Sequence, residues 1–553
     1  MAQQLPIVYV RGFAGTPSGI DAAVDDPFYG FNDGSTHVRV GGSGDPLFYQ
    51  FESPLLRLMI DHHYELIVKG GQRPWLLAQP DGEVNPATIW VHRFYDVSAS
   101  TFGEKPQGFT PERAAENLLE LIELLQRKTG APRVHLVAHS MGGLICRCLL
   151  QKVIPDQRQK TGKSATDYVE RLFTYATPHG GIEFDLGLGM LERLRDTFGI
   201  GGGEIFGPQR MYEYLTPGKA QSPPPDWQAR DIPDDAFPKH RIFSLIGTNP
   251  ADYGAARGLS SKAVGAKSDG LVQIENAYVP GAKFAYVHRS HSGRYGIVNS
   301  EEGYQNLRRF LFGSLEVQAE IVGLQLPQSE EGVVWQAEAE LAVRGLPILM
   351  HQQVAAHHCP INVELPAGTA DNPLPLITTF LLADPQFRPN EGDPARYTLH
   401  LRVLSLREER RGIFDFNDHL EQTADFDDVL VVDVGTLDGR LVAWAIWNSA
   451  LPTPLRDYRP SGKPLADEEK APGVWLTHVP LPESALAFLG REAAVRLTVF
   501  DRDSEGLAGL RNAGKAASSD RARPTLAARP QPRGNVLTRA IRRVIGRGRC
   551  QPF

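Results

Sequence analysis

The segment that most constrains the fold of this chain is a serine placed between two apolar runs. Residues 134–137 predict a strand and residues 144–150 a helix, and Ala138–Gly143, reading A-H-S-M-G-G, separates them. A strand, a sharp turn and a helix with serine at the apex is the layout of a nucleophile elbow. Small flanking residues let the backbone pass while the turn exposes the hydroxyl. Ala138 replaces the first glycine of the strict pattern, but alanine is nearly as small, so the segment predicts Ser140 as a nucleophile.

This segment resembles the nucleophile turn of the α/β-hydrolase lipases and esterases. Some bacterial lipases have the same six residues. The resemblance covers about residues 1–312 and rests on four motifs. It implies an α/β-hydrolase fold, no metal or organic cofactor, and a triad in the chain order nucleophile, acid, histidine.

The acid and the histidine are expected downstream of Ser140. Asp269 precedes a β-like run at 284–287, and His291 follows that run ahead of a predicted helix over 301–312. An acid after one strand and a histidine after the next is the geometry that a triad requires. We therefore predict Asp269 and His291.

Alternatives remain open for both positions. His288 is the alternative histidine, at the end of the predicted strand, and Asp252 is the reserve acid. His291 is preferred because similar lipases have a histidine followed by x-Gly before their last helix, as in His291-Ser292-Gly293.

The N-terminus supplies a further motif, in which a predicted strand over 5–10 is followed by Arg11-Gly12-Phe13. Many lipases have His-Gly-Phe here, and the resemblance makes the N–H after the glycine an oxyanion donor. Phe13 N–H and Met141 N–H are the two expected donors, and Met141 lies at a helix start, where the dipole favours an anion. Arg11 departs from the usual histidine.

Another lipase-like motif is the T-P-H-x-G segment at 177–181, which contains His179. Because His179 precedes the predicted acid in the chain, a structural role is expected for it. A helix is predicted over 110–130, capped by Thr110 and ended by Gly130. An apolar, glycine-containing insertion at about 182–240 suggests a lid, and an insertion with several aromatic residues at about 20–90 suggests a second cover of the same mouth. Ordinary core packing is equally consistent with both.

From residue 315 the pattern changes to short β-like runs separated by polar turns. They lie at 315–326, 334–343, 376–382, 397–406, 429–434, 441–447, 474–479 and 494–500. This predicts an antiparallel β-sandwich. The expected domains are therefore a catalytic domain at 1–314, a β domain at 315–505 and a tail at 506–553.

The tail is strongly basic. It holds eleven Lys and Arg against one acid, Asp520, so it carries about +10 and, as the whole chain carries −7, the remainder carries about −17. Its composition predicts disorder. A basic amphipathic helix at 535–547 would suit an anionic membrane surface, but a solvated tail is the preferred interpretation.

Composition adds further bounds. A length of 553 residues predicts at least two cores, and four cysteines suit a reducing compartment. No stretch is long and apolar enough for a transmembrane helix, and the N-terminus lacks a basic n-region. A cytoplasmic location is expected, with export by a signal-less route left open, and no nucleic-acid partner is predicted.

The sequence thus predicts a serine carboxylic-ester hydrolase that works through an acyl-enzyme on Ser140. One alternative is a phospholipase acting on membrane lipids, such as an exported antibacterial toxin. Another is a non-catalytic binding or scaffold protein with a vestigial hydrolase core. The residues do not reveal the acyl length, the headgroup or the oligomeric state.

Overall fold

The computed structural model describes most of the chain up to residue 502. The described residues are 4–12, 21, 23–32, 34–40, 44–51, 53–67, 72–96, 109–182, 204–219, 222–251, 265–293, 295–326, 333–363, 373–382, 394–409, 419–437, 440–468 and 473–502. Residues 1–504 form one compact unit with two hydrophobic cores, one built mainly from residues before 313 and the other from residues after 314. The domain boundaries that the sequence suggests stay a prediction.

The N-terminal core is organised around a parallel sheet of seven strands. Its order is β4 (Glu65–Leu66), β5 (Thr88–His92), β1 (Ile7–Val10), β6 (Val134–His139), β7 (Val169–Tyr175), β8 (Ile242–Gly247) and β9 (Lys283–Val287). Strands β1, β5 and β6 are almost entirely buried, as expected where helices cover both faces of a parallel sheet. With its covering helices, this sheet confirms the predicted α/β-hydrolase fold.

The strand order fixes where a site can form. After β1 the chain builds β4 and β5 on one side and then returns to build β6 to β9 on the other. The parallel neighbours β1 and β6 are therefore followed by connections that lead to opposite sides of the sheet. Val10 pairs with Ala138 in this register. Ligands bind at such a switch point, outside the carboxyl ends of the strands. Gly12 and Ser140, which follow these two strands, therefore lie at the sheet's natural binding position.

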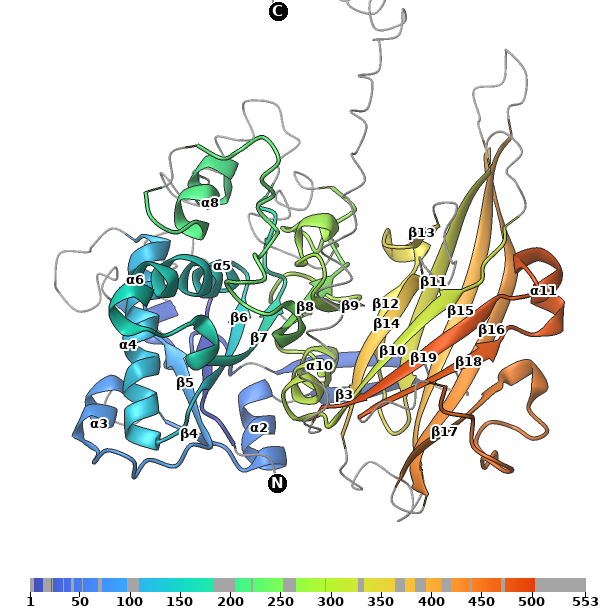
Figure 1. Ribbon diagram of the computed structural model, residues 1–553, viewed down its shortest axis with the longest axis horizontal. Helices are drawn as coiled ribbons and strands as arrows, with labels where there is room; N and C mark the ends of the chain where they lie inside the picture. The colour runs from blue at the N-terminus through green and yellow to red at the C-terminus, as the bar shows by residue number, and fades with distance from the viewer. Residues whose placement is uncertain are drawn as a thin grey trace, which may run out of the picture. The chain divides into compact units, whose positions relative to one another are not determined.

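Helices cover both faces of the sheet (Figure 1). One side carries α3 (Gln72–Ala78), α4 (Pro111–Thr129), α5 (Met141–Cys148) and α6 (Ile154–Thr161), and the other carries α2 (Pro54–His62) and α10 (Glu301–Phe312). A single π-helical turn, Leu149–Val153, joins α5 to α6. A short helix, α8 (Pro208–Leu215), also contacts α5.

Capping residues determine where helix α4 begins and ends and where helix α10 begins. The side chain of Thr110 accepts a hydrogen bond from Arg113 N, and Gly130 ends α4 in the left-handed conformation. At α10 the side chain of Ser300 accepts from Gly303 N. Each cap satisfies a backbone group that the helix itself leaves unpaired, which explains why both helices begin and end where the sequence indicates.

The C-terminal region folds into two antiparallel sheets, as predicted. The first has the order β14 (Leu374–Leu381), β10 (Leu315–Val322), β19 (Ala494–Asp501) and β18 (Val474–Pro480). The second runs β12 (Leu349–Gln353), β11 (Val333–Val343), β15 (Ala395–Glu409), β16 (His419–Leu437) and β17 (Arg440–Trp447), with β13 (Ile361–Val363) also paired to β11. Their inner faces share one core (Figure 1). A short helix, α11 (Glu483–Leu489), follows β18.

The C-terminal region also contacts the strand and helix that flank the predicted histidine. The ring of His357 stacks on His288 with centroids 3.8 Å apart, just beyond β9. Asn306 of α10 donates to the carbonyl of Met350 at 3.0 Å, and Arg502 donates to the carbonyl of Phe310 at 2.9 Å. The C-terminal sheets therefore hold β9 and α10, between which His291 lies.

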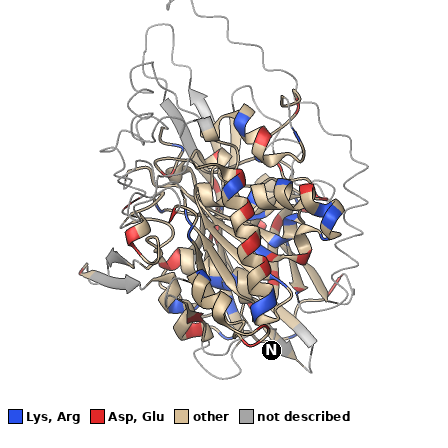
Figure 2. Ribbon diagram, turned by 90° about the vertical axis from the view of Figure 1, so that its left-hand side faces the viewer, with Lys and Arg blue, Asp and Glu red and all other residues tan. Residues whose placement is uncertain are grey.

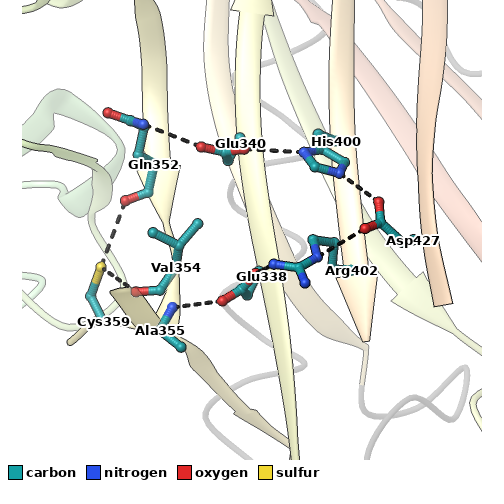
Figure 3. A network of polar contacts seen from close by, with 9 residues as sticks. All are labelled: Glu338, Glu340, Gln352, Val354, Ala355, Cys359, His400, Arg402 and Asp427. Carbon is teal, nitrogen blue, oxygen red and sulfur yellow. Dashed lines mark hydrogen bonds and ion pairs between the residues drawn. The ribbon is translucent and has the colours of Figure 1, made fainter. Parts of the chain in front are cut away.

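Charges on the hydrolase helices are of both signs and interspersed (Figure 2). A network of polar contacts in the C-terminal region lies mainly on β11, β15 and β16 (Figure 3). There His400 lies between Glu340, 3.1 Å from Nδ1, and Asp427, 2.7 Å from Nε2. Arg402 joins Asp427 to Glu338 in the same network.

This network predicts a pH-dependent stability. The hydrogen bond to Glu340, opposed by burial and helped by Asp427, raises the pKa of His400 from 6.5 to about 9. Because the folded pKa is raised, the stabilisation is complete below about pH 6.5 and is lost as the pH rises through about 9.

In the wild-type protein the free energy of unfolding should therefore fall between these two pH values. In His400→Gln this fall should be smaller by roughly 1 kcal/mol, after allowance for solvent screening. Denaturation of both proteins by urea, followed by circular dichroism at each pH, measures this difference. Parallel pH profiles for wild type and variant would contradict it.

Some expectations fall outside the described residues. These are the basic tail at 506–553 and its membrane-binding helix, and much of the 182–240 insertion. Within the described ranges, no helix combines the length and apolar character needed to cross a membrane.

Candidate active site

Ser140 sits at the apex of the predicted elbow. It has φ 53° and ψ −129°, a backbone conformation that residues other than glycine rarely adopt. Hydrogen bonds hold it there: Ser140 N donates to the carbonyl of Tyr175, and Thr177 Oγ1 donates to the carbonyl of Ser140, both at 2.9 Å. Strain that neighbours enforce in this way is typical of functional positions.

Glycine is required at three positions around the serine because other atoms lie too close for a side chain. A Cβ on Gly142 would lie 2.2 Å from the carbonyl oxygen of Val10, and one on Gly143 would lie 2.2 Å from Thr177 Oγ1. A Cβ on Gly12 would lie 2.6 Å from the Cβ of Ser140. The loop after β1 therefore touches the serine directly, and no larger residue fits at this contact.

His291 is the histidine that meets this serine. Its Nε2 lies 2.9 Å from Ser140 Oγ, and its Nδ1 lies 2.9 Å from Asp269 Oδ2. The side chains of His291 and Asp269 are almost completely buried. The structure thus brings together the three residues that the sequence selected, although they lie up to 151 positions apart.

Asp269 is held in place through both carboxylate oxygens. Its Oδ1 accepts from the backbone N–H groups of Leu271 at 3.0 Å and Val272 at 2.8 Å, which leaves Oδ2 for the imidazole. The backbone N–H of His291 also donates to the carbonyl of Asp269 at 2.9 Å. Acid and histidine are therefore connected through main chain and side chain, which fixes the ring plane.

His139, next to the serine, supports the same histidine. Its Nε2 lies 2.9 Å from the carbonyl oxygen of His291 and the two rings are 5.0 Å apart. Burial, followed by the nearby His291, lowers the pKa of His139 to about 3. A neutral His139 with its proton on Nε2 donates to that carbonyl and positions the loop.

The alternative residues lie elsewhere. His288 stacks on His357, and its Nδ1 is 3.4 Å from Thr248 Oγ1. His179 is fully buried, with Nε2 3.2 Å from Thr174 Oγ1, and burial lowers its pKa well below the usual value. The reserve acid Asp252 lies outside the described residues.

A cavity of about 240 Å³ opens onto Ser140 and His291. Its walls come from the loop after β1, from the turn Tyr29–Phe31 and from the segment Val298–Asn299. Tyr29 and Phe31 of the 20–90 insertion therefore line the site, and both are also part of the buried N-terminal core.

Of the two expected oxyanion donors, only Met141 can be located. It is the first residue of α5, directly after Ser140, where helix N–H groups lack intrahelical partners. Phe13 lies outside the described residues, although Gly12 before it touches Ser140. In the described part of the chain no group of His, Cys, Asp and Glu is arranged to hold a metal ion.

Sequence reasoning missed several residues around the site. The roles of His139, Tyr29 and Asn299 follow from contacts between segments far apart in the chain, which composition and spacing do not reveal. Only His139 carried a signal, since it lies inside the elbow motif itself.

A comparison with known protein families finds a match that includes Ser140. Residues 97–194, which contain the elbow and its helix, match the family model for class 2 lipases. The chain carries a hydrolase domain of the lipase and esterase type. No curated protein matches the chain.

Several solved structures match just over half of this chain at low identity. The lin2722 gene product of Listeria innocua is 15% identical, covers 56% of this chain and 94% of its own, and has a TM-score of 0.23. A putative cell surface hydrolase from Lactobacillus plantarum is 12% identical. The match covers 56% of this chain and 92% of that protein, with a TM-score of 0.25. Naproxen esterase from Bacillus subtilis is 12% identical, the match covers 56% of this chain and 83% of the esterase, and the TM-score is 0.21. These scores are low, and the assignment of the hydrolase domain rests on the strand order and the matched family.

Proposed function

We propose that this protein is a serine carboxylic-ester hydrolase that forms an acyl-enzyme on Ser140. The observation that carries the proposal is the continuous chain of hydrogen bonds from Asp269 through His291 to Ser140, with 2.9 Å at each of its two contacts. Ser140 and His291 of this hydrogen-bonded series line a cavity, which lies at the carboxyl ends of the parallel strands.

The proposed reaction runs in two halves. His291 Nε2 accepts the proton of Ser140 as Oγ attacks the ester carbonyl, and it then gives that proton to the leaving alcohol. Asp269 stabilises the imidazolium that forms between these steps. Water, deprotonated by the same nitrogen, attacks the acyl-enzyme and releases the carboxylic acid, which restores Ser140. Met141 N–H, with Phe13 N–H as the second donor, would bind the oxyanion of each tetrahedral intermediate.

A fluorophosphonate probe tests this proposal without knowledge of the natural substrate. We expect stoichiometric labelling of the wild-type protein, with the phosphonyl group on the peptide that contains Ser140 in a mass spectrum. Ser164→Ala serves as the control, since Ser164 caps a short turn outside the cavity. A native protein that stays unlabelled, or one labelled at another serine, would refute the assignment.

A further inference from the structure

The cavity beside Ser140 has a positive charge that the proposed ester chemistry does not use. Arg11 lines it, directly before Gly12. Among the described residues that line this cavity, Arg11 is the one fully charged side chain, and none of them is Asp or Glu. An anionic group that enters the cavity therefore meets the cation of Arg11 in its wall.

Arg11 is fixed close to the reacting serine. Its carbonyl oxygen would lie 2.5 Å from a Cβ on Gly142, so its backbone packs against the start of α5. Its side chain donates through Nη1 to the carbonyl of Tyr29. The charge of Arg11 also lowers the pKa of His139, the residue before Ser140. A guanidinium carries five N–H donors, so it can bind a carbonyl and an anionic oxygen together.

The turn that holds Arg11 is itself preorganised. Tyr29 has φ 51° and Gly30 has φ 81°, both in the left-handed region. The carboxylate of Asp26 accepts from the N–H groups of Phe28 and Gly30, and the hydroxyl of Tyr29 donates to Asp96 at 2.5 Å. These two acids are used by the turn and do not line the cavity. Strain of this kind persists where the surroundings enforce it, and it clusters at ligand sites.

Asn299 adds a second polar side chain to the same wall. Its Nδ2 lies 3.5 Å from the carbonyl of Gly30, next to the carbonyl that Arg11 binds. Its Oδ1 is buried and has no hydrogen-bond partner among the described residues. This oxygen can accept a hydrogen bond from a hydroxyl or N–H group of a ligand beside the guanidinium.

We infer that Arg11 is a specificity residue, which binds an anionic group of the ester substrate, a carboxylate or a phosphate, beside Ser140. The inference rests on the proposed ester hydrolysis and narrows its substrate class. The anion belongs either to the acyl chain or to the alcohol, because either part of a bound ester reaches the walls of a 240 Å³ cavity.

Two pairs of esters separate these sources. The acyl pair is the 4-nitrophenyl half-ester of glutaric acid and its neutral methyl ester. The alcohol pair is butyryl glycerol phosphate and neutral monobutyrin. In one pair, wild-type protein is expected to show a higher kcat/KM for the anionic member. Arg11→Gln is expected to lower that anionic-to-neutral ratio by about 10- to 100-fold, the size expected for a hydrogen bond to a charged group.

Matched variants separate binding from support of the turn. Arg11→Lys keeps the charge and should retain part of the preference. Arg158→Gln removes one charge from an exposed position on α6 and should leave the ratio unchanged. Added salt should reduce the wild-type preference by screening. If Arg11→Gln lowers both members of each pair equally, Arg11 only supports the turn and the inference is wrong.

Wild-type protein supplies a test that needs no folded variant. Glutarate and inorganic phosphate should each be tried as competitive inhibitors of neutral ester hydrolysis at low salt, and at least one should compete. Hydrolysis of neutral esters with no anion preference and no competition overturns the inference alone. Absence of neutral ester hydrolysis, together with an unlabelled Ser140, overturns the proposed function and the inference with it.

Discussion

Ser140→Ala is expected to lower ester hydrolysis by about 10⁴- to 10⁶-fold, because loss of one triad member removes the concerted action of all three. The proposed oxyanion donors and the cavity remain in this variant, so a small rate above that of water should persist. Turnover of a soluble 4-nitrophenyl ester, measured against the uncatalysed rate, tests the prediction. Activity within tenfold of wild type would remove Ser140 from the mechanism.

A second substitution at the same position separates chemistry from folding. Ser140 has φ 53°, a conformation that glycine adopts without strain and alanine does not. Ser140→Gly should therefore be as inactive as Ser140→Ala while unfolding at an equal or higher temperature. Loss of activity in both variants without loss of stability assigns the effect to the missing hydroxyl. Unfolding of Ser140→Gly well below wild type would show that the elbow stores no strain at this residue.

The sequence predicted the elements whose signals are local. Thr110 and Gly130 bound α4, and Ser300 begins α10, because capping depends on residues within one turn of the helix end. The elbow was predictable for the same reason, since small residues between a strand and a helix leave few other conformations. Chain order then indicated Asp269 and His291 without any knowledge of distance.

Elements that depend on distant partners were harder to predict. Strand β16 covers His419–Leu437, although only 429–434 reads as apolar, because pairing with β15 extends it through a charged stretch. Strands β12 and β13 were missed because they are short and surround the turn that contains His357. The cavity walls were hidden for a related reason, since Tyr29 and Asn299 are about 270 positions apart and meet only in the folded chain.

The choice between the two histidines leads to the second large expected effect. His291→Ala should match Ser140→Ala in severity, since its Nε2 lies 2.9 Å from Ser140 Oγ and no other ring nitrogen takes that position among the described residues. Without the imidazole, the serine keeps its proton and the leaving alcohol receives none. The expected loss of turnover is again about 10⁴- to 10⁶-fold.

His288→Ala is the matched control, because it removes the same side chain three positions earlier. That ring stacks on His357 and contacts Thr248, so its loss should cost stability through the lost stacking and lower turnover far less than His291→Ala does. Kinetics and thermal unfolding of the two variants, measured side by side, distinguish the roles. A histidine that acts on the serine should change turnover with little change in stability, and a histidine that braces β9 against the C-terminal sheets should do the reverse. If His288→Ala were the inactive variant and His291→Ala stayed active, the base would have to be reassigned, and the loop after β9 would have to rearrange before catalysis.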